Sequence, residues 1–260
     1  MVYANIIKRL LLQAALSTAI TISTTMIVNV NAAPSVEINV MASVAFKEPY
    51  LKRVAQFEKN GIKVKTTWLP TVEIVKHIIS ADAGDLVIID SKNIDALTSQ
   101  GKLRAESKIN YLSSGIGIGI AKGAKRPVVT NKEDLKNLLL NVHSIAYSTG
   151  PSGAYLVSLF DQMGIAQQIQ SKTKVIQGEP VGNLVKRGEV EIGFQQIPEI
   201  LSVPEIDFAG PLPDDVQYVT TFAFSVPSSK PITPEIEELI NWLKSPESFA
   251  DIRAHGLEPK

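Results

Sequence analysis

The sequence predicts an α/β protein of two lobes, each with a parallel-rich sheet covered by helices. Three observations predict it. Segments with strand character alternate with segments of helical spacing, a Val/Ile/Leu run lies at Asp85–Ile89, and the alternation restarts after a glycine-alternating strand at Ser113–Ala121. Such alternation indicates a parallel sheet with helices on both faces, where a buried strand is a continuous apolar run.

The individual elements follow from local patterns. Apolar residues from Tyr50 to Phe57 have helical spacing, and Gly61 suits the position that ends that helix. β-Branched residues alternate in Ile62–Trp68, as in a strand. The further strands expected are Val36–Ala42, His143–Tyr147, Thr173–Gln177, Val190–Phe194 and Gln217–Val226. The helices expected are Glu48–Asn60, Val72–Ala81, Ile94–Gln100, Lys132–Leu140, Gly153–Met163, Val181–Arg187, Pro198–Leu201 and Pro234–Lys244.

Two segments are expected to carry the chain between the lobes. They are Ser113–Ala121 and Tyr218–Val226, which gives a first lobe of residues 33–116 plus 225–260 and a second of 117–224. Glycines at alternate positions of the first segment let the backbone bend, so we expect a hinge there. The alternative is that these glycines only permit close packing.

Residues 1–32 have the layout of a secretory signal peptide. Lys8 and Arg9 precede an apolar stretch, and Val30-Asn31-Ala32 has the small or apolar residues of a cleavage site. The alternative is a retained membrane anchor, but the apolar stretch contains several Ser and Thr and no aromatic anchor. We therefore expect a periplasmic protein.

Composition excludes several classes of function. The chain has 26 basic and 26 acidic residues and no cysteine, so it has no general attraction to nucleic acid, no disulfide and no Cys-based zinc site. Its three histidines are far apart in sequence, without the spacing of a zinc-protease helix. We expect no metal and no cofactor.

Hydroxyl residues follow three of the predicted parallel strands. Ser43 ends the first strand, Thr71 begins the helix after the second, and Ser148-Thr149-Gly150-Pro151-Ser152-Gly153 follows the strand at 143–147. Such turns meet at the carboxyl edge of a sheet, where helix N-termini offer free N–H groups to an anion. A single Ser or Thr there is more commonly a helix cap. Three hydroxyls and two glycines in six residues, however, exceed what capping needs and favour an anion site.

On these motifs, the chain resembles the periplasmic molybdate-binding proteins, which have the type 2 periplasmic-binding-protein fold with two hinge crossovers. The motifs are NVMASVAF at 39–46, TVEIVKHI and AGDLVIID within 71–90, STGPSGAY at 148–155, VEIGF at 190–194 and VQYVTTFAFSV at 216–226. The resemblance implies an anion held by hydroxyls and backbone amides in a cleft, with a permease of the ABC type as partner. We expect the protein to be a monomer. By position, the resemblance implies that Ser43, Thr71, Ser152, Tyr218 and the backbone near Phe194 bind the ligand. Ser148, Thr149 and Gly153 of the hydroxyl-rich turn are expected to bind it as well.

The sequence departs from that family after VEIGF. Gln195 and Gln196 stand where molybdate binders have a hydrophobic residue followed by Tyr-Gly-Ser. An amide both donates and accepts hydrogen bonds, which suits carboxylate and hydroxyl groups better than a fully ionised oxyanion. We therefore add both glutamines to the expected ligand-binding residues, the alternative being a solvated loop. The ligand is expected to be an oxyanion or a di- or tricarboxylate.

The resemblance also extends to aconitate isomerase, an enzyme that shifts an allylic proton in a tricarboxylate. Such activity needs a general base beside the bound substrate. Glu48, Glu179 and Glu199 are the acidic residues nearest the candidate turns in sequence, and no pair of them stands out as an acid–base couple. No arginine falls in those turns, which weighs against a ligand with three negative charges. A transport receptor is thus the first reading, and an isomerase is the alternative.

Overall fold

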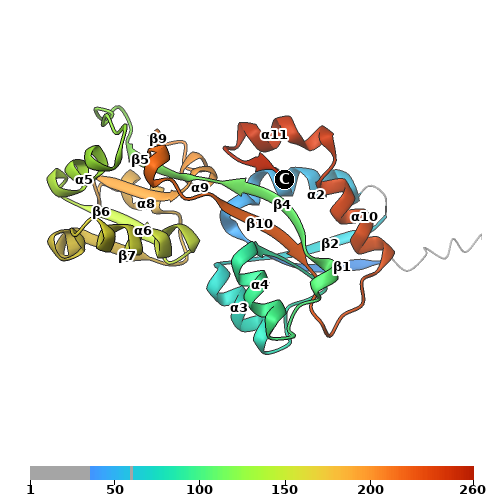
Figure 1. The fold of residues 1–260 in the computed structure, drawn as a ribbon. Helices are drawn as coiled ribbons and strands as arrows, with labels where there is room; N and C mark the ends of the chain where they lie inside the picture. The colour runs from blue at the N-terminus through green and yellow to red at the C-terminus, as the bar shows by residue number, and fades with distance from the viewer. Residues whose placement is uncertain (1–35, 59–60) are drawn as a thin grey trace, which may run out of the picture. The chain divides into compact units, whose positions relative to one another are not determined.

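The computed structural model describes residues 36–58 and 61–260, which form two sheets. The predicted signal peptide lies outside the described residues. Within them, the first sheet contains six strands in the order β11 (Glu258–Pro259), β4 (Ile109–Ser114), β10 (Thr220–Ser225), β3 (Leu86–Asp90), β1 (Glu37–Ser43) and β2 (Lys63–Leu69) (Figure 1). The second contains five, in the order β7 (Thr173–Ile176), β6 (Ile145–Ser148), β8 (Ile192–Gln196), β5 (Ile116–Ala121) and β9 (Ile206–Pro211).

Helices cover both faces of each sheet. The first sheet packs on one face against α2 (Lys47–Phe57), α10 (Pro234–Leu243) and α11 (Phe249–Ala254), and on the other against α3 (Thr71–Ile79) and α4 (Ser91–Ser99). The second packs against α5 (Lys132–Asn141), α6 (Pro151–Gln162) and α7 (Ala166–Ile169) on one face, and α8 (Val181–Lys186) and α9 (Ile197–Leu201) on the other. This two-sided cover explains why every residue of β3 is buried.

The predicted α/β class is confirmed, although the sheets are less uniformly parallel than predicted. β1 pairs in parallel with β2 and β3, and β6 pairs in parallel with β7 and β8. β10 and β4 are antiparallel to their neighbours, as are β5 and β9. The sequence reading missed β9, an edge strand of partly exposed residues that ends in Gly210-Pro211 and lacks an alternating pattern.

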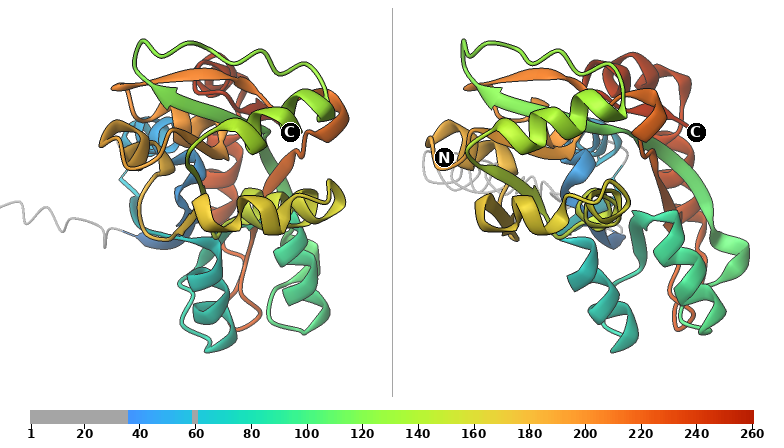
Figure 2. Two further views of the ribbon diagram at one scale, coloured as in Figure 1. Left: turned by 90° about the vertical axis from the view of Figure 1, so that its left-hand side faces the viewer. Right: turned by 60° about the vertical axis from the view of Figure 1, so that its left-hand side comes forward.

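The chain passes between the sheets twice, and the passages lie side by side (Figures 1 and 2). The first is at Gly115, between β4 and β5, so the segment expected to be one strand is two. The second is at 212–219, between β9 and β10. The expected boundary at 224/225 differs from this, because β10 pairs with β3 and β4 in the first sheet.

Two of the alternating glycines are needed for packing. A Cβ at Gly117 would lie 2.8 Å from the Phe208 ring, and one at Gly119 would lie 3.1 Å from Ile206 and 3.2 Å from Ile200. Both positions are inside β5, where α9 and β9 pack closely on it. The packing alternative therefore accounts for these two glycines, and only Gly115 lies at a passage.

Gln217 ties the two passages together. Its amide oxygen accepts from the Ile116 N–H at 2.7 Å, and its nitrogen donates to the carbonyl oxygens of Ile116 at 3.1 Å and Leu212 at 3.2 Å. A Cβ at Gly115 would lie 3.0 Å from this side chain. Gly115 thus leaves the space in which Gln217 joins the second passage to the start of β5.

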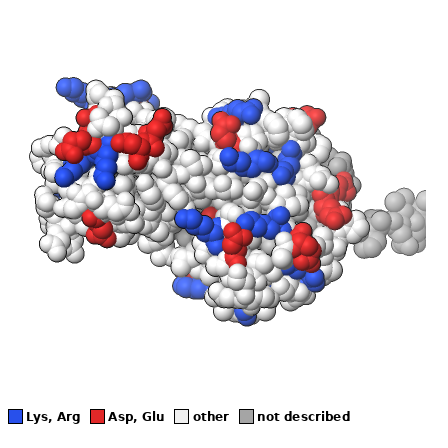
Figure 3. All heavy atoms as spheres, in the orientation of Figure 1, with Lys and Arg blue, Asp and Glu red and all other residues white. Residues whose placement is uncertain are grey.

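No helix among the described residues is long and apolar enough to cross a membrane. On the face shown in Figure 3, Lys and Arg lie among Asp and Glu.

Candidate functional site

A cavity of about 570 Å³ lies between turns of the first sheet and turns of the second. From the first sheet, the turns are those after β1 and β2; from the second, those after β6, β7 and β8. All five follow the carboxyl ends of parallel strands, where open α/β sheets place their ligands. The polar lining residues are Ser43, Lys47, Glu48, Thr71, Ser148, Thr149, Ser152, Gln177, Glu179, Gln195, Gln196, Glu199, Ser202 and His255.

Several helices begin at this cavity. α3 starts at Thr71, α6 at Pro151, α8 at Val181 and α9 at Ile197, each next to a lining residue. The first N–H groups of α8 and α9 are taken, because Val181 donates to Gln195 Oε1 at 2.7 Å and Ile197 donates to the Gly115 carbonyl at 3.0 Å. This leaves α3 and α6 to present their N-termini to the cavity. The first N–H groups of a helix have no partner within the helix and carry its positive end. The cavity is therefore suited to a negatively charged ligand.

Thr71 has a buried hydroxyl without a partner. Its side chain is 6% exposed and lines the cavity, and its Oγ1 makes no hydrogen bond to any described residue. Leaving a buried polar group unpaired costs about 1–3 kcal/mol, so most such groups have a protein, water or ligand partner. This hydroxyl is available to a molecule in the cavity.

The hydroxyl-rich turn after β6 is shaped by Gly153. A Cβ at Gly153 would lie 1.6 Å from the Ser148 carbonyl oxygen, which no side chain tolerates. Glycine therefore lets the first turn of α6 pack directly on the end of β6. In this arrangement Ser152 is 1% exposed and lines the cavity with Ser148 and Thr149.

Gln195 is held by two hydrogen bonds and holds Glu199 in turn. Its Oε1 accepts from the Val181 N–H at 2.7 Å, and its Nε2 donates to Glu199 Oε1 at 2.6 Å. Burial raises the pKa of Glu199 to about 8, although hydrogen bonds from the Gln195 side chain and the Gln196 backbone oppose the rise. Glu199 thus titrates close to neutral pH at the wall of the cavity.

Gln196 connects the second sheet to both passages. In the amide orientation that satisfies both of its ends, the oxygen accepts from the Thr220 hydroxyl at 2.8 Å. The nitrogen then donates to the carbonyl oxygens of Ser114 at 3.1 Å and Gly115 at 3.3 Å. The side chain is 1% exposed, so its amide belongs mainly to this junction although the residue also lines the cavity.

The two sheets also meet across the mouth of the cavity. Gln177, which follows β7, donates from Nε2 to Glu73 Oε1 on α3 at 3.2 Å. Gln177 is among the lining residues. This contact joins the two sides of the cavity at a point distant in sequence from both passages.

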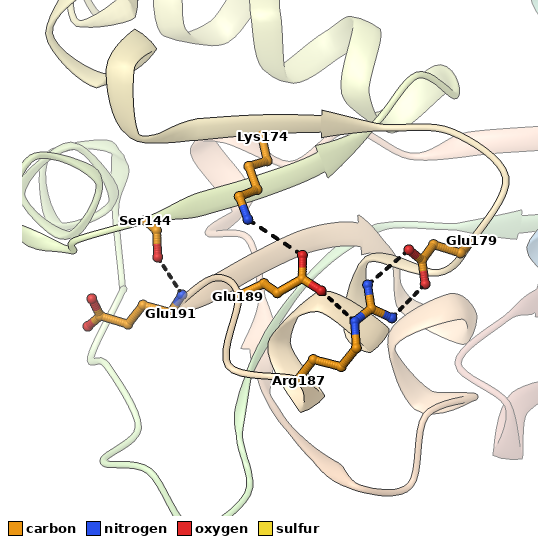
Figure 4. Close-up of polar contacts among 6 residues, drawn as sticks. All are labelled: Ser144, Lys174, Glu179, Arg187, Glu189 and Glu191. Atoms are coloured by element: carbon orange, nitrogen blue, oxygen red, sulfur yellow. Dashed lines mark hydrogen bonds and ion pairs between the residues drawn. The ribbon is translucent and has the colours of Figure 1, made fainter.

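The charged residues of the lining differ in whether they are already paired with another side chain. Arg187 holds Glu179 by two hydrogen bonds of 2.9 and 3.0 Å, and the guanidinium also contacts Glu189 (Figure 4). These bonds from Arg187 keep the pKa of Glu179 below its ordinary value. Glu48 and Lys47 are exposed at the start of α2. The negative charge of Glu179 is therefore already paired with the Arg187 guanidinium.

His255 reaches the cavity from the end of α11. Its Nδ1 lies 2.7 Å from the Asp251 carbonyl oxygen, which only accepts, so Nδ1 carries the proton. In the neutral ring Nε2 is then the unprotonated nitrogen. No group of His, Cys, Asp and Glu in the described part of the chain is arranged to hold a metal ion.

The structure brings seven of the ten expected ligand-binding residues to one cavity and leaves three outside its lining. Ser43, Thr71, Ser148, Thr149, Ser152, Gln195 and Gln196 line it. Gly153 is buried in the first turn of α6 and is not among the lining residues. Phe194 is fully buried in the core of the second sheet, with its backbone paired to β5 and β6.

Tyr218, expected to bind the anion, also lies outside the lining. Its ring stacks on Tyr155 with centroids 4.8 Å apart and 15° between planes, and the Lys92 ammonium lies 4.8 Å from its centroid. Tyr218 therefore joins the second passage to α6, on which Tyr155 lies. Tyr218 thus lies beside the second passage, and a role in binding the anion stays a prediction.

Sequence reasoning missed four polar lining residues: Lys47, Gln177, Ser202 and His255. Lys47 directly follows Ser43-Val44-Ala45-Phe46, so its distance from the first turn was a usable signal. Gln177 closes the predicted strand at 173–177 and was likewise accessible. Nothing local indicates His255, which reaches the site only because α11 packs on the first sheet.

Residues 38–258 match the bacterial extracellular solute-binding protein family. The chain is 30% identical over 210 residues to an aconitate isomerase from Pseudomonas sp., covering 78% of this chain and 80% of that protein. Its fold is similar to that of the periplasmic molybdate-binding protein from Azotobacter vinelandii, with 18% identity, a TM-score of 0.65 and coverage of 85% and 98%.

It is also similar to the substrate-binding domain of a putative molybdenum ABC transporter from Clostridium difficile. The identity is 17% and the TM-score 0.62, with 86% of this chain and 99% of that chain covered. These likenesses show the type 2 periplasmic-binding-protein fold that the sequence motifs implied. With the family match over 38–258, they identify the chain as a member of the bacterial extracellular solute-binding protein family.

Proposed function

We propose that this protein binds a small carboxylate anion in the cavity between its two sheets. One observation carries the proposal: the N-termini of α3 and α6 lie at a cavity that also contains the unpartnered Thr71 hydroxyl. Helix N-termini and neutral donors stabilise negative charge without a counter-ion. Ser43, Ser148, Thr149 and Ser152 supply further hydroxyl donors to the same space.

The size and chemistry of the lining favour an organic acid over a bare oxyanion. About 570 Å³ is within the range of roughly 300–1,000 Å³ typical of sites for organic ligands. Lys47 adds a cation that offsets carboxylate charge.

As a periplasmic receptor, the protein would close over its ligand by movement at Gly115 and 212–219 and then dock on an ABC permease. Residues 1–32, with the character of a signal peptide, support export, and the family is extracellular. Closure removes the anion from water and completes its shell of donors, so binding and conformation are coupled.

The test is a panel of ligands on residues 33–260, read by thermal shift and then by calorimetry. The panel contains cis-aconitate, trans-aconitate, citrate, tricarballylate, molybdate, tungstate, sulfate and phosphate. We expect stabilisation by one or more carboxylates at micromolar concentration. Stabilisation by molybdate or tungstate with no response to any carboxylate would overturn the proposal.

A second function, isomerisation of aconitate, is favoured by the state of Glu199. This residue lies in the cavity with a pKa of about 8, and pKa values shifted toward neutral pH are typical of proton-transfer sites. The 30% identical relative is an aconitate isomerase. The test follows interconversion of cis- and trans-aconitate by proton NMR, and binding of both isomers without interconversion would leave only the receptor function.

A further inference from the structure

We propose that Glu199 is the residue that removes and returns the allylic proton of the bound substrate, and that Gln195 is its positioning residue. This inference rests on the proposed isomerase function and assigns the residues that would perform it. The hydrogen bonds of Gln195 determine how the Glu199 carboxyl is held at the wall of the cavity.

The orientation of the Gln195 amide is fixed by its neighbours. The Val181 backbone N–H only donates, so the amide oxygen faces it at 2.7 Å. The amide nitrogen must then face Glu199, where it donates to Oε1 at 2.6 Å. Gln195 is 3% exposed, so the amide has little freedom to turn. One carboxyl oxygen of Glu199 is thereby held in place at the wall of the cavity.

Glu199 also has a structural alternative. It is the third residue of α9, whose N-cap is Gln196, and it accepts from the Gln196 backbone N–H as in a capping box. A glutamine at this position also serves in a capping box. The substitution Glu199→Gln therefore keeps the shape of the side chain and one acceptor oxygen but removes the capacity to carry a proton.

The other titratable groups of the lining are less suited to the role. Glu179 is occupied by Arg187, and Glu48 is exposed at the start of α2. Lys47 is an exposed cation that suits charge compensation. His255 has its Nδ1 proton committed to the Asp251 carbonyl, and its Nε2 is the remaining competitor of Glu199 for proton transfer.

The Glu199 carboxylate alone can carry the proton in both directions of the reaction. Ionised Glu199 takes a proton from the methylene carbon of aconitate, and the C–H electron pair becomes a new C=C bond to the central carbon. The electron pair of the former C=C bond becomes a C–H bond at the opposite carbon when Glu199 returns the proton. The product is again aconitate, because both outer carbons carry a carboxylate, and no oxidant or co-reactant is consumed.

Raised basicity supports this assignment. A carboxylate with a pKa of about 8 is a stronger base than an ordinary glutamate, and about one-tenth of it is ionised at pH 7. Since the ionised form is the base, kcat/KM is expected to rise with pH and to level off above about pH 8. The other ionisable side chains that line the cavity are Lys47, Glu48, Glu179 and His255.

The experiment compares Glu199→Gln with Glu238→Gln, the same chemical change on the exposed face of α10. We expect Glu199→Gln to bind both aconitate isomers within about threefold of the wild-type affinity and to lose at least a thousandfold in kcat. Glu238→Gln should match the wild type. Melting temperatures show that both variants are folded.

Gln195→Met tests positioning through the pH profile. The Gln195 hydrogen bond lowers the pKa of Glu199, so its removal should raise the pH midpoint of kcat/KM. A merely structural role would reduce kcat without moving that midpoint.

The outcomes separate this assignment from the proposed function. If the wild type binds aconitate but does not interconvert its isomers, the isomerase function fails and the assignment fails with it. If the wild type turns over and Glu199→Gln retains more than a tenth of its kcat, the isomerase stands and the assignment is wrong, with His255→Asn the next variant. Loss of aconitate binding in folded Glu199→Gln would also overturn it, because Glu199 would then be a binding residue.

Discussion

At the scale of single residues, the Thr71 hydroxyl is the clearest mark of ligand binding. It is buried at the start of α3, it lines the cavity, and no described residue pairs with it. An unpartnered hydroxyl destabilises the free protein, and a hydrogen bond to an anion offsets that cost only when a ligand is present. Function and stability therefore oppose each other at this position.

The substitution Thr71→Val should leave the stability of the free protein unchanged or slightly raised, because it replaces an unpaired hydroxyl by a methyl group of similar size. It should weaken binding of the anion by about 10- to 100-fold, the equivalent of roughly 1.5–3 kcal/mol for a hydrogen bond to a charged group. Thr98→Val is the matched control, since Thr98 Oγ1 is also buried and unpaired but lies on α4, outside the lining. Calorimetry on both variants checks the prediction, and equal affinity losses in the two would contradict it.

At the scale of elements, the turn from β6 to α6 depends on the absence of a side chain at Gly153. The helix begins so close to the strand that the Ser148 carbonyl occupies the place of a Cβ. This close approach directs the free N–H groups of the first turn of α6, with Ser152, to the cavity. The composition of the turn predicted a ligand-binding role for Gly153, and the structure shows that glycine is needed there for close packing.

Gly153→Ala should destabilise the protein by about 3 kcal/mol or more, because a contact of 1.6 Å with backbone forces the turn apart. Gly150→Ala, two residues before Ser152, is the matched control. Its Cβ would meet only Ser148 Oγ at 3.6 Å, so we expect a loss below about 1 kcal/mol. Urea unfolding of both variants measures the difference, and similar midpoints would show that the turn adapts.

At the scale of the described protein, the two sheets are joined by two passages, by packing of α9 on Val44–Phe46 and on Gly256, and by a hydrogen bond between Gln177 and Glu73. Gln217 and Gln196 fasten the passages to each other and to the second sheet. Gln177, which lines the cavity, donates a hydrogen bond to Glu73 on α3. Movement at Gly115 and 212–219 would thus change the cavity while leaving each sheet intact.

Small-angle X-ray scattering should show a smaller radius of gyration when the stabilising carboxylate is added to wild-type protein. Gln177→Ala removes the contact across the cavity, so the free protein should become more open and the change on ligand binding larger. Lys122→Ala, at the far end of β5, should leave both values unchanged. An identical radius with and without saturating ligand would contradict closure.

The sequence by itself determined the features that depend on neighbours along the chain. Apolar spacing and turn residues predicted the parallel strands β1, β2, β3, β6, β7 and β8 and the helices after them, and hence the hydroxyl turns that meet at the cavity. These are local signals, because a parallel strand buried on both faces and a helix cap are each encoded within a few residues.

Only the tertiary structure decided which residues face the cavity and in what state. Gln195 was expected to bind a ligand directly, yet its amide lies between Val181 and Glu199, and Tyr218 stacks on Tyr155. Burial raises the pKa of Glu199, and His255 lines the cavity because α11 packs on the first sheet. Both depend on packing between segments far apart in the chain. Such properties arise from desolvation and contact in three dimensions, and no local pattern encodes them.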